Sequence, residues 1–230
     1  TDTGIDVSVE GMEHQAEADL GPFAEWDGSN GISRLSVDNE TICQHQAPQL
    51  TFGKVKVAPP PRAFTQATPQ GEQALQEAVG RALAGADKVV DLFSGAGTLG
   101  LPLAEVATLH CMENDLGLLE ALAHGVRHTQ DIKKVATSAR DLYRNPIDHT
   151  DLIKFNAAII DPPRAGAEQQ VRQLAQSNLR DIAMVSCNPV TFARDANILC
   201  AGGYGLKWVE AVDQFRWSPH IEIVAHFSKA

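Results

Sequence analysis

Past residue 61, apolar runs of strand length alternate with amphipathic stretches of helical length, and this alternation limits the possible folds more than any other feature. Apolar runs bounded by turn residues are typical of buried strands, and apolar positions spaced three and four apart are typical of helices. Strands are expected at 88–93, 108–112, 135–137, 155–160 and 182–185, and helices at 69–83, 98–105, 116–128, 168–176 and 190–200. This order predicts an α/β fold with a mostly parallel, doubly wound sheet. Two closing strands, near 206–212 and 221–227, lack a helix between them and predict an antiparallel hairpin.

The first 57 residues follow a different pattern. Apolar and polar residues alternate over 5–9 and 32–37, as in half-buried strands, and Asp27-Gly28 and Asn30-Gly31 are turn signals. The stiff link Pro59-Pro-Pro61 follows. We therefore predict a small β-rich segment over 1–57 and a larger α/β domain over 58–230. Because the chain begins without Met and in polar residues, we expect it to be a fragment.

Charge and cysteine content exclude several classes of protein. The net charge is −10, with 29 acidic residues against 19 Lys and Arg, which is a poor match for a free-standing nucleic-acid binder. No apolar run approaches the roughly 20 residues that a membrane span needs. The scattered cysteines form no C-x-x-C pair, so neither a zinc site nor an iron–sulfur cluster is expected, and they suit a reducing cytoplasm. They are Cys43, Cys111, Cys187 and Cys200.

A glycine-rich turn joins the strand at 88–93 to the following helix. It reads Asp91-Leu-Phe-Ser-Gly-Ala-Gly-Thr-Leu-Gly100, and glycines there let the backbone approach a ligand at a helix N-terminus. Glu113 ends the next strand, near the spacing expected for an acid that binds a ribose diol. A solvated acid at a strand end is the plainer interpretation of Glu113. The order Asp-x-Phe-x-Gly-x-Gly looks more like the S-adenosylmethionine turn of methyltransferases than a NAD site.

Three further stretches place reactive side chains at strand ends. Asp161-Pro-Pro-Arg164 holds an acid after a buried strand, and Cys187 follows the strand at 182–185. Glu222 lies in an otherwise apolar strand, where a carboxylate is costly unless it is paired or functional. A desolvated carboxylate is also a natural general base. Each residue also has a plainer interpretation. Asp161 would be an exposed acid in a turn, Cys187 a small buried thiol, and Glu222 an outward-facing residue of an edge strand.

Together these stretches resemble the RNA uracil-5-methyltransferases, the bacterial enzymes that make 5-methyluridine in 23S rRNA and tRNA. The similarity runs from about residue 61 to the end, and its most specific parts are Asp-Pro-Pro-Arg-Ala-Gly166, Ser-Cys-Asn-Pro189 and His-Ile-Glu222 in that order. It implies a class I methyltransferase fold and S-adenosylmethionine as cofactor. It also implies a structured RNA as partner, with rRNA favoured over tRNA, and no DNA partner.

The resemblance also assigns roles to residues. Cys187 would be the nucleophile and Glu222 the base that removes the proton from uracil carbon 5. The implied cofactor contacts are Gln66, Phe93, Thr98, Glu113, Asp141 and Asp161. The implied substrate contacts are Phe64, Asp161 and Arg164.

The sequence also departs from the family, and two other functions stay open. Thr68 and Thr98 stand where many members have Asn, and we expect this chain to lack the usual N-terminal RNA-binding β-barrel and iron–sulfur cysteines. Residues 1–57 look like a remnant of the family's central β-rich domain. A non-catalytic RNA-binding module would not need both Cys187 and Glu222. A methyltransferase for a small molecule is favoured only by the negative charge.

Overall fold

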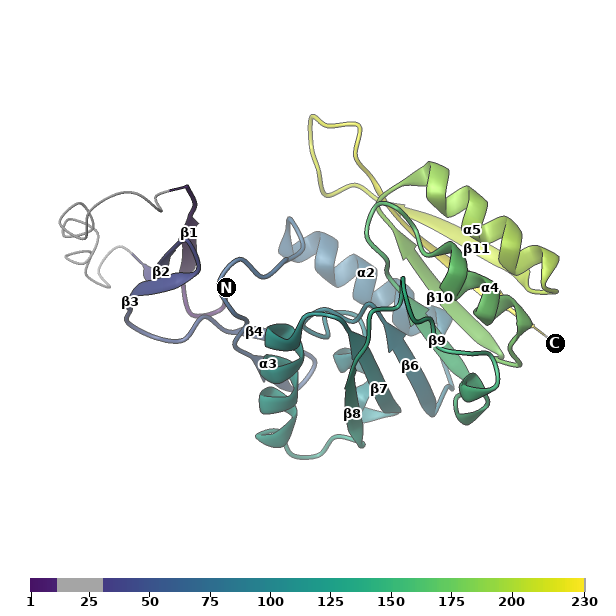
Figure 1. Cartoon of the computed structure of the whole chain (residues 1–230). Helices are drawn as coiled ribbons and strands as arrows, with labels where there is room; N and C mark the ends of the chain where they lie inside the picture. The colour runs from purple at the N-terminus through teal and green to yellow at the C-terminus, as the bar shows by residue number, and fades with distance from the viewer. Residues whose placement is uncertain (12–30, 230) are drawn as a thin grey trace.

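The larger part of the chain folds around one seven-stranded mixed sheet (Figure 1). The computed structural model describes residues 1–11 and 31–229. The strand order is β11-β12-β10-β9-β6-β7-β8. In chain order these strands are β6 (Lys88–Leu92), β7 (Thr108–Glu113), β8 (Val135–Ala139), β9 (Ala157–Ile160), β10 (Asp181–Ser186), β11 (Gly205–Val212) and β12 (Glu222–Ser228). The pairs from β8 to β10 are parallel, and β12 runs antiparallel to both β10 and β11. The predicted sheet and its closing antiparallel hairpin are confirmed.

Two apolar layers cover the sheet because alternate strand residues point to opposite faces. Val89, Leu109 and Ile159 belong to a core with α2 (Pro69–Ala82) and α3 (Leu116–Arg127). Val90, Met112 and Ile160 belong to the opposite core, which takes in residues of α4 (Glu168–Gln176) and α5 (Pro189–Ala201). Strands buried on both faces explain why the sequence shows continuous apolar runs rather than strict alternation.

The helices begin where short polar side chains can cap them. The Thr68 hydroxyl accepts a hydrogen bond from the Gly71 N–H (3.0 Å), and Pro69 occupies the first turn of α2. Asp115 caps α3 and Asn188 caps α5 in the same way. The fourth helix, α4, follows Ala167 and has no side-chain cap. All four helices match the predicted ones to within one residue at each end.

The prediction of an α-helix over 98–105 was wrong, both in the type of helix and in the residue at which it begins. The structure has only a short 3₁₀ helix, η3 (Leu101–Glu105), and a second one, η4 (Asp151–Lys154), before β9. The backbone is wound into a turn before η3, with positive φ at Phe93, Gly95 and Gly97. A right-handed helix cannot begin at those angles, so it starts only after the turn has closed. The same angle at Phe93 ends β6 at Leu92, one residue before the predicted end.

The N-terminal part forms two small sheets. In the first, β2 (Ile32–Val37) pairs parallel with β1 (Ile5–Val9) and antiparallel with β3 (Glu40–Gln44). The second is a hairpin of β4 (Leu50–Phe52) and β5 (Val55–Val57). The turn expected at Asp27-Gly28 lies outside the described residues. The turn expected at Asn30-Gly31 lies half outside them, because Asn30 is not described and Gly31 is.

The β4–β5 hairpin packs into the core of the large sheet. Phe52, Val55 and Val57 are buried in the same cluster as Leu75 of α2. A Cβ at Gly125 of α3 would lie 2.4 Å from the Lys56 carbonyl oxygen, so only glycine permits this contact. A domain boundary at 57 stays a prediction, and residues 50–57 contribute to the core of the larger unit.

Within the described residues, no helix is both long and apolar enough to cross a membrane.

Candidate active site

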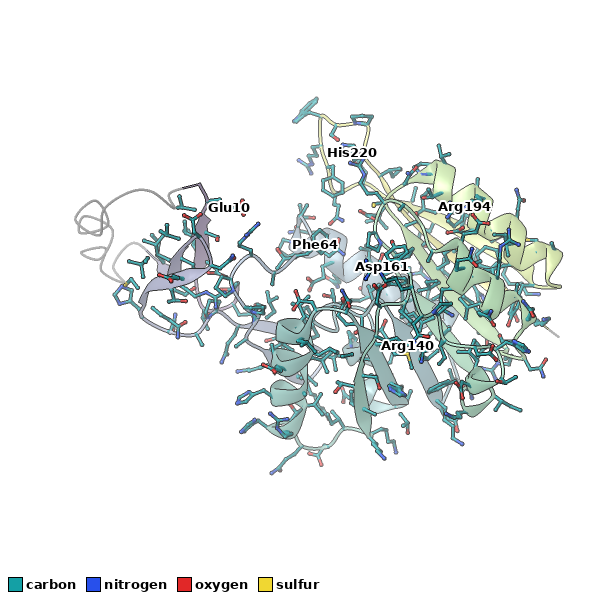
Figure 2. All side chains as sticks on the ribbon, in the orientation of Figure 1. Glu10, Phe64, Arg140, Asp161, Arg194 and His220 are labelled. Atoms are coloured by element: carbon teal, nitrogen blue, oxygen red, sulfur yellow. The ribbon has the colours of Figure 1, made fainter. Side chains whose placement is uncertain are left out.

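Cys187 and Glu222 come together because two antiparallel strands bring their ends to one edge of the sheet. Ser186, the last residue of β10, pairs with Ile223 of β12. Cys187 follows Ser186, and Glu222 precedes Ile223, so both stand one step beyond that pair. Asp161 follows β9, the other neighbour of β10. Figure 2 labels Asp161 at this edge, where the ends of parallel strands form the usual ligand crevice of such folds.

Burial and two neighbouring carboxylates raise the pKa of the Cys187 thiol. Burial raises its pKa, and the negative charges of Glu222 and Asp161 raise it further, while the Arg164 guanidinium opposes them. The thiol is half-buried and makes no disulfide. At neutral pH the resting site therefore holds Cys187 as the protonated thiol.

Three carboxyl groups at this edge have pKa values displaced upward. Desolvation raises the pKa of Asp161 to about 7, and Glu222 adds to the effect. Desolvation, Asp161 and Glu113 raise the pKa of Asp91 to about 8. Desolvation also raises the pKa of the buried Glu222, although Gln214 and Arg164 work against it. Such a crowded group of carboxylates would be relieved by a cation placed among them.

The glycine turn is tied to the end of β7. One oxygen of Glu113 accepts the Gly95 N–H (3.0 Å), and the other accepts the N–H groups of Asn114 (2.7 Å) and Asp115 (3.1 Å). Glu113 therefore lies beside the turn, as the spacing predicted. Gly100 is packed against Asp91, where a Cβ would lie 2.3 Å from the carboxylate oxygen Oδ2.

The turn leaves polar atoms and space available to a ligand. The Ser94 hydroxyl is buried and has no hydrogen-bond partner among the described residues. A Cβ built on Gly95 would meet open space. Thr98 lies at the end of the turn, where its carbonyl accepts a hydrogen bond from the Gln76 side chain (3.1 Å). These features fit a small polar ligand lying along the turn.

A chain of amides joins the linker before α2 to the general-base candidate. The Gln214 amide donates to the Gln66 side-chain oxygen (2.7 Å), and Gln214 lies close enough to Glu222 to lower its pKa. Gln214 is buried, and a Cβ at Gly71 would lie 2.5 Å from its Oε1. Gln66 is thus held at the site, whereas Phe64, two residues earlier, is 72% exposed.

Arg164 and His220 connect the loop after β9 to the loop before β12. The Arg164 guanidinium donates to His220 Nδ1 (2.8 Å). The Asn188 side chain and the Thr191 hydroxyl both donate to the Arg164 carbonyl oxygen (3.0 and 3.2 Å), which fixes the Asp-Pro-Pro-Arg loop against the start of α5. Arg164 therefore reaches across the site from a braced backbone.

Aromatic rings from the turn after β6 and the loop after β8 pack together. Phe93 packs on Tyr143 with ring centroids 5.3 Å apart. Asp141 accepts the N–H groups of Tyr143 (3.0 Å) and Arg144 (3.1 Å), so its carboxylate shapes the loop that presents Tyr143. Among the described residues, the side-chain contacts of Asp141 are made within this loop and not with Cys187 or Glu222.

Sequence reasoning missed four side chains of this site, namely Asp91, Gln214, Tyr143 and His220. Asp91 opens the glycine motif, and its burial could have been inferred from the apolar run around it. Gln214 and His220 lie in a loop with no periodicity, and only the fold brings them to Gln66 and Arg164.

Two cavities lie away from these residues. One of about 230 Å³ is lined by residues of β7, β8 and the loop before β9, His110 and Ser138 among them. Another of about 600 Å³ lies between the β4–β5 hairpin and α3 and is lined by Lys54, Lys56 and His124. Neither is lined by a predicted site residue.

The strand order, the glycine turn and the acid at the end of β7 define a class I S-adenosylmethionine-dependent methyltransferase fold. A solved structure of Pyrococcus abyssi tRNA (uracil-54, C5)-methyltransferase, in complex with S-adenosyl-L-homocysteine, superposes with a TM-score of 0.73 at 25% identity. The match covers 88% of this chain and 53% of that one.

Sequence comparison narrows the class to a family. Residues 122–230 match the family model described as tRNA (Uracil-5-)-methyltransferase. An uncharacterized RNA methyltransferase of Mesorhizobium japonicum is 44% identical over all of this chain and 56% of its own length. The 23S rRNA (uracil(1939)-C(5))-methyltransferase RlmD of Pseudomonas syringae pv. tomato is 33% identical over 92% of this chain and 49% of its own length. The chain belongs to the RNA uracil-5-methyltransferase family, and it spans about half the length of the curated relatives it matches.

Proposed function

We propose that this chain carries the catalytic part of an enzyme that methylates carbon 5 of a uridine in a structured RNA. The observation that carries the proposal is the placement of Cys187 and Glu222 beyond one strand pair, beside Asp161. A thiol and a desolvated base at one edge are the two groups that this chemistry needs. The four cysteines of the chain are scattered and form no C-x-x-C pair, which is compatible with a reducing cytoplasm.

The glycine turn is the proposed site of S-adenosylmethionine. Glu113 would accept hydrogen bonds from the ribose, Phe93 and Asp141 would lie near the adenine, and Gln66, Thr98 and Asp161 would complete the site. When bound, the cofactor supplies an electrophilic methyl group on a positively charged sulfur. The upward-shifted pKa values of Asp91 and Asp161 support this assignment, because a sulfonium would offset their mutual repulsion.

Cys187 is proposed to start the reaction. Carbon 5 of uracil is a weak nucleophile, and addition of the thiolate to carbon 6 pushes the electron pair of the double bond toward the carbonyl oxygen. The resulting enolate makes carbon 5 able to accept the methyl. The thiol proton must leave first, and Asp161 is the acceptor beside Cys187 that leaves Glu222 unprotonated for the last step.

Glu222 is proposed to finish the reaction. After methylation carbon 5 still carries its proton, and the ring becomes aromatic again only when that proton leaves. Glu222 takes the proton, the electron pair reforms the double bond, and the bond between carbon 6 and the Cys187 sulfur breaks. The pKa of Glu222 is raised by desolvation, which makes it a stronger base than a solvated carboxylate.

We further propose rRNA rather than tRNA as the substrate, since the P. syringae relative that acts on 23S rRNA is the more similar in sequence. Phe64 and Arg164 would contact the target nucleotide. Labelled S-adenosylmethionine should be incubated with this chain and unmodified 23S rRNA or tRNA transcripts at low salt, which offsets the repulsion due to its charge of −10. We expect 5-methyluridine in the rRNA digest.

The same assay tests the alternatives. Binding of the cofactor without methyl transfer to either RNA would contradict the proposed function and leave a binding module or a small-molecule methyltransferase. Methyl transfer to tRNA alone would contradict only the choice of rRNA.

A further inference from the structure

Trp217 is the most exposed large apolar side chain of the described residues, at 102% of its reference area. It stands in the loop between β11 and β12, which rises above the sheet as the yellow loop of Figure 1. Its φ angle is +68°, a region that bulky residues rarely adopt. A tryptophan held in an unfavourable backbone conformation, with its ring in water, contributes nothing to the packing of this chain.

The loop that presents Trp217 is braced rather than loose. The Ser218 N–H donates to the Phe215 carbonyl (3.1 Å), and the His220 N–H donates to the Ser218 hydroxyl (3.0 Å). The Phe215 ring lies edge-on to the His220 ring, with centroids 6.2 Å apart. Both ends of the loop are anchored in the site, through the contact of Gln214 with Gln66 and that of His220 with Arg164. Trp217 is therefore displayed at a fixed place beside the reactive residues.

The surroundings of Trp217 favour a nucleic acid over an apolar protein surface. Arg216 precedes it, is exposed and makes no ion pair among the described residues. Arg164 and His220 lie at the base of the same loop; Figure 2 labels His220 there. An aromatic ring beside cationic side chains is the arrangement with which proteins hold single-stranded RNA, by stacking on a base and attracting the adjacent phosphates.

We infer that Trp217 stacks on an unpaired base of the substrate RNA next to the target uridine and that Arg216 contacts the adjoining phosphate. This inference rests on the proposed function, because it takes the loop as the rim of an RNA site. Stacking needs no particular base, since every base offers a flat face. Trp217 would thus be a positioning residue that holds the strand while Cys187 and Glu222 act on the target base.

Binding of a single-stranded uridine octamer tests the stacking without any methyl transfer. Tryptophan emission should be quenched on titration, and Trp217→Ala should remove that quenching and weaken binding by roughly 5- to 100-fold. Trp217→Phe should retain most of the affinity, whereas Trp217→Leu, apolar but not aromatic, should behave as Trp217→Ala does. Ile153→Ala is the matched control, since Ile153 is also exposed (76%) and lies in η4. We expect wild-type affinity from it.

Kinetics on the rRNA transcript then separate this inference from the proposed function. Trp217→Ala should raise KM for RNA much more than it lowers kcat. Absence of methyl transfer by the wild type would contradict the proposed function, while the octamer titration would still test the stacking. Equal octamer affinity in wild type and Trp217→Ala would overturn the inference. A concentration-dependent dimer that dissociates in Trp217→Ala, with unchanged octamer binding, would instead make Trp217 a protein contact.

Discussion

Cys187 and Glu222 stand on neighbouring antiparallel strands, each one residue beyond the pair Ser186–Ile223. Sequence separates them by a helix, a strand and a loop, and the register of β12 against β10 brings them together. A shift of that register by one residue would turn Glu222 to the other face of the sheet. The proposed chemistry therefore depends on the pairing of two strands as much as on the two side chains.

The order of chemical steps predicts different failures for two substitutions. With rRNA, Cys187→Ala should form no covalent protein–RNA species, because no other thiol adjoins Glu222. Glu222→Gln should add to the base and transfer the methyl, then accumulate a denaturation-resistant adduct, because the carbon 5 proton cannot leave. Mass spectrometry of both variants checks this. Cys200→Ala, at an exposed thiol, should resemble the wild type. An adduct in Cys187→Ala would overturn the assignment.

Removing the carboxylate of Glu113 should weaken cofactor binding. Loss of a hydrogen bond to a charged group costs about 1.5–3 kcal/mol, which corresponds to roughly 10- to 100-fold in affinity. Calorimetry with S-adenosyl-L-homocysteine on Glu113→Ala measures it. Glu120→Ala serves as control, since Glu120 is exposed on α3. If both variants bind alike, Glu113 is not part of the site.

Because the cofactor is positively charged, its affinity relative to that of its neutral product should depend on pH. The pKa of Asp161 is raised to about 7, so its carboxyl is mostly neutral at pH 5.5 and mostly ionised at pH 8.5. A sulfonium gains from the ionised form and a neutral thioether does not. The affinity for S-adenosylmethionine relative to S-adenosyl-L-homocysteine should therefore rise on the order of tenfold between these pH values. Calorimetry with both ligands checks it, and Asp161→Asn should reduce the rise to the part that comes from ionisation of Asp91, whose pKa is raised to about 8. A ratio independent of pH in the wild type would contradict it.

The contact between Gly100 and Asp91 predicts a site-specific effect on stability. A Cβ at position 100 would lie 2.3 Å from Asp91 Oδ2, so Gly100→Ala should destabilise the fold by about 1–3 kcal/mol. Gly80 is the matched glycine, because a Cβ there meets nothing and the residue lies inside α2. Gly80→Ala should stabilise by about 0.5–1 kcal/mol. Thermal unfolding distinguishes them, and equal shifts would refute the crowding at Gly100.

Sequence periodicity was sufficient to predict the sheet and its helices, because strands such as β10 are buried on both faces and appear in the sequence as unbroken apolar runs. It failed at 98–105, where the apolar residues suggest a helix but the positive φ angles of the glycine turn delay it. The residues at strand ends could be predicted, since each interrupts an apolar run with a reactive group. Gln214 and Trp217 could not, because loop residues acquire their place from contacts that leave no period in the sequence.

The packing of the β4–β5 hairpin has a consequence for how this fold can be recombined with other modules. Phe52, Val55 and Val57 are almost completely buried against the larger domain. Burial of each is worth about 1.5–3 kcal/mol, and a typical domain has only about 5–15 kcal/mol in total. A chimera joined at the proline link would discard these three side chains and leave α3 uncovered. A junction placed before Leu50 would keep them, so another module can be joined there without opening the methyltransferase core.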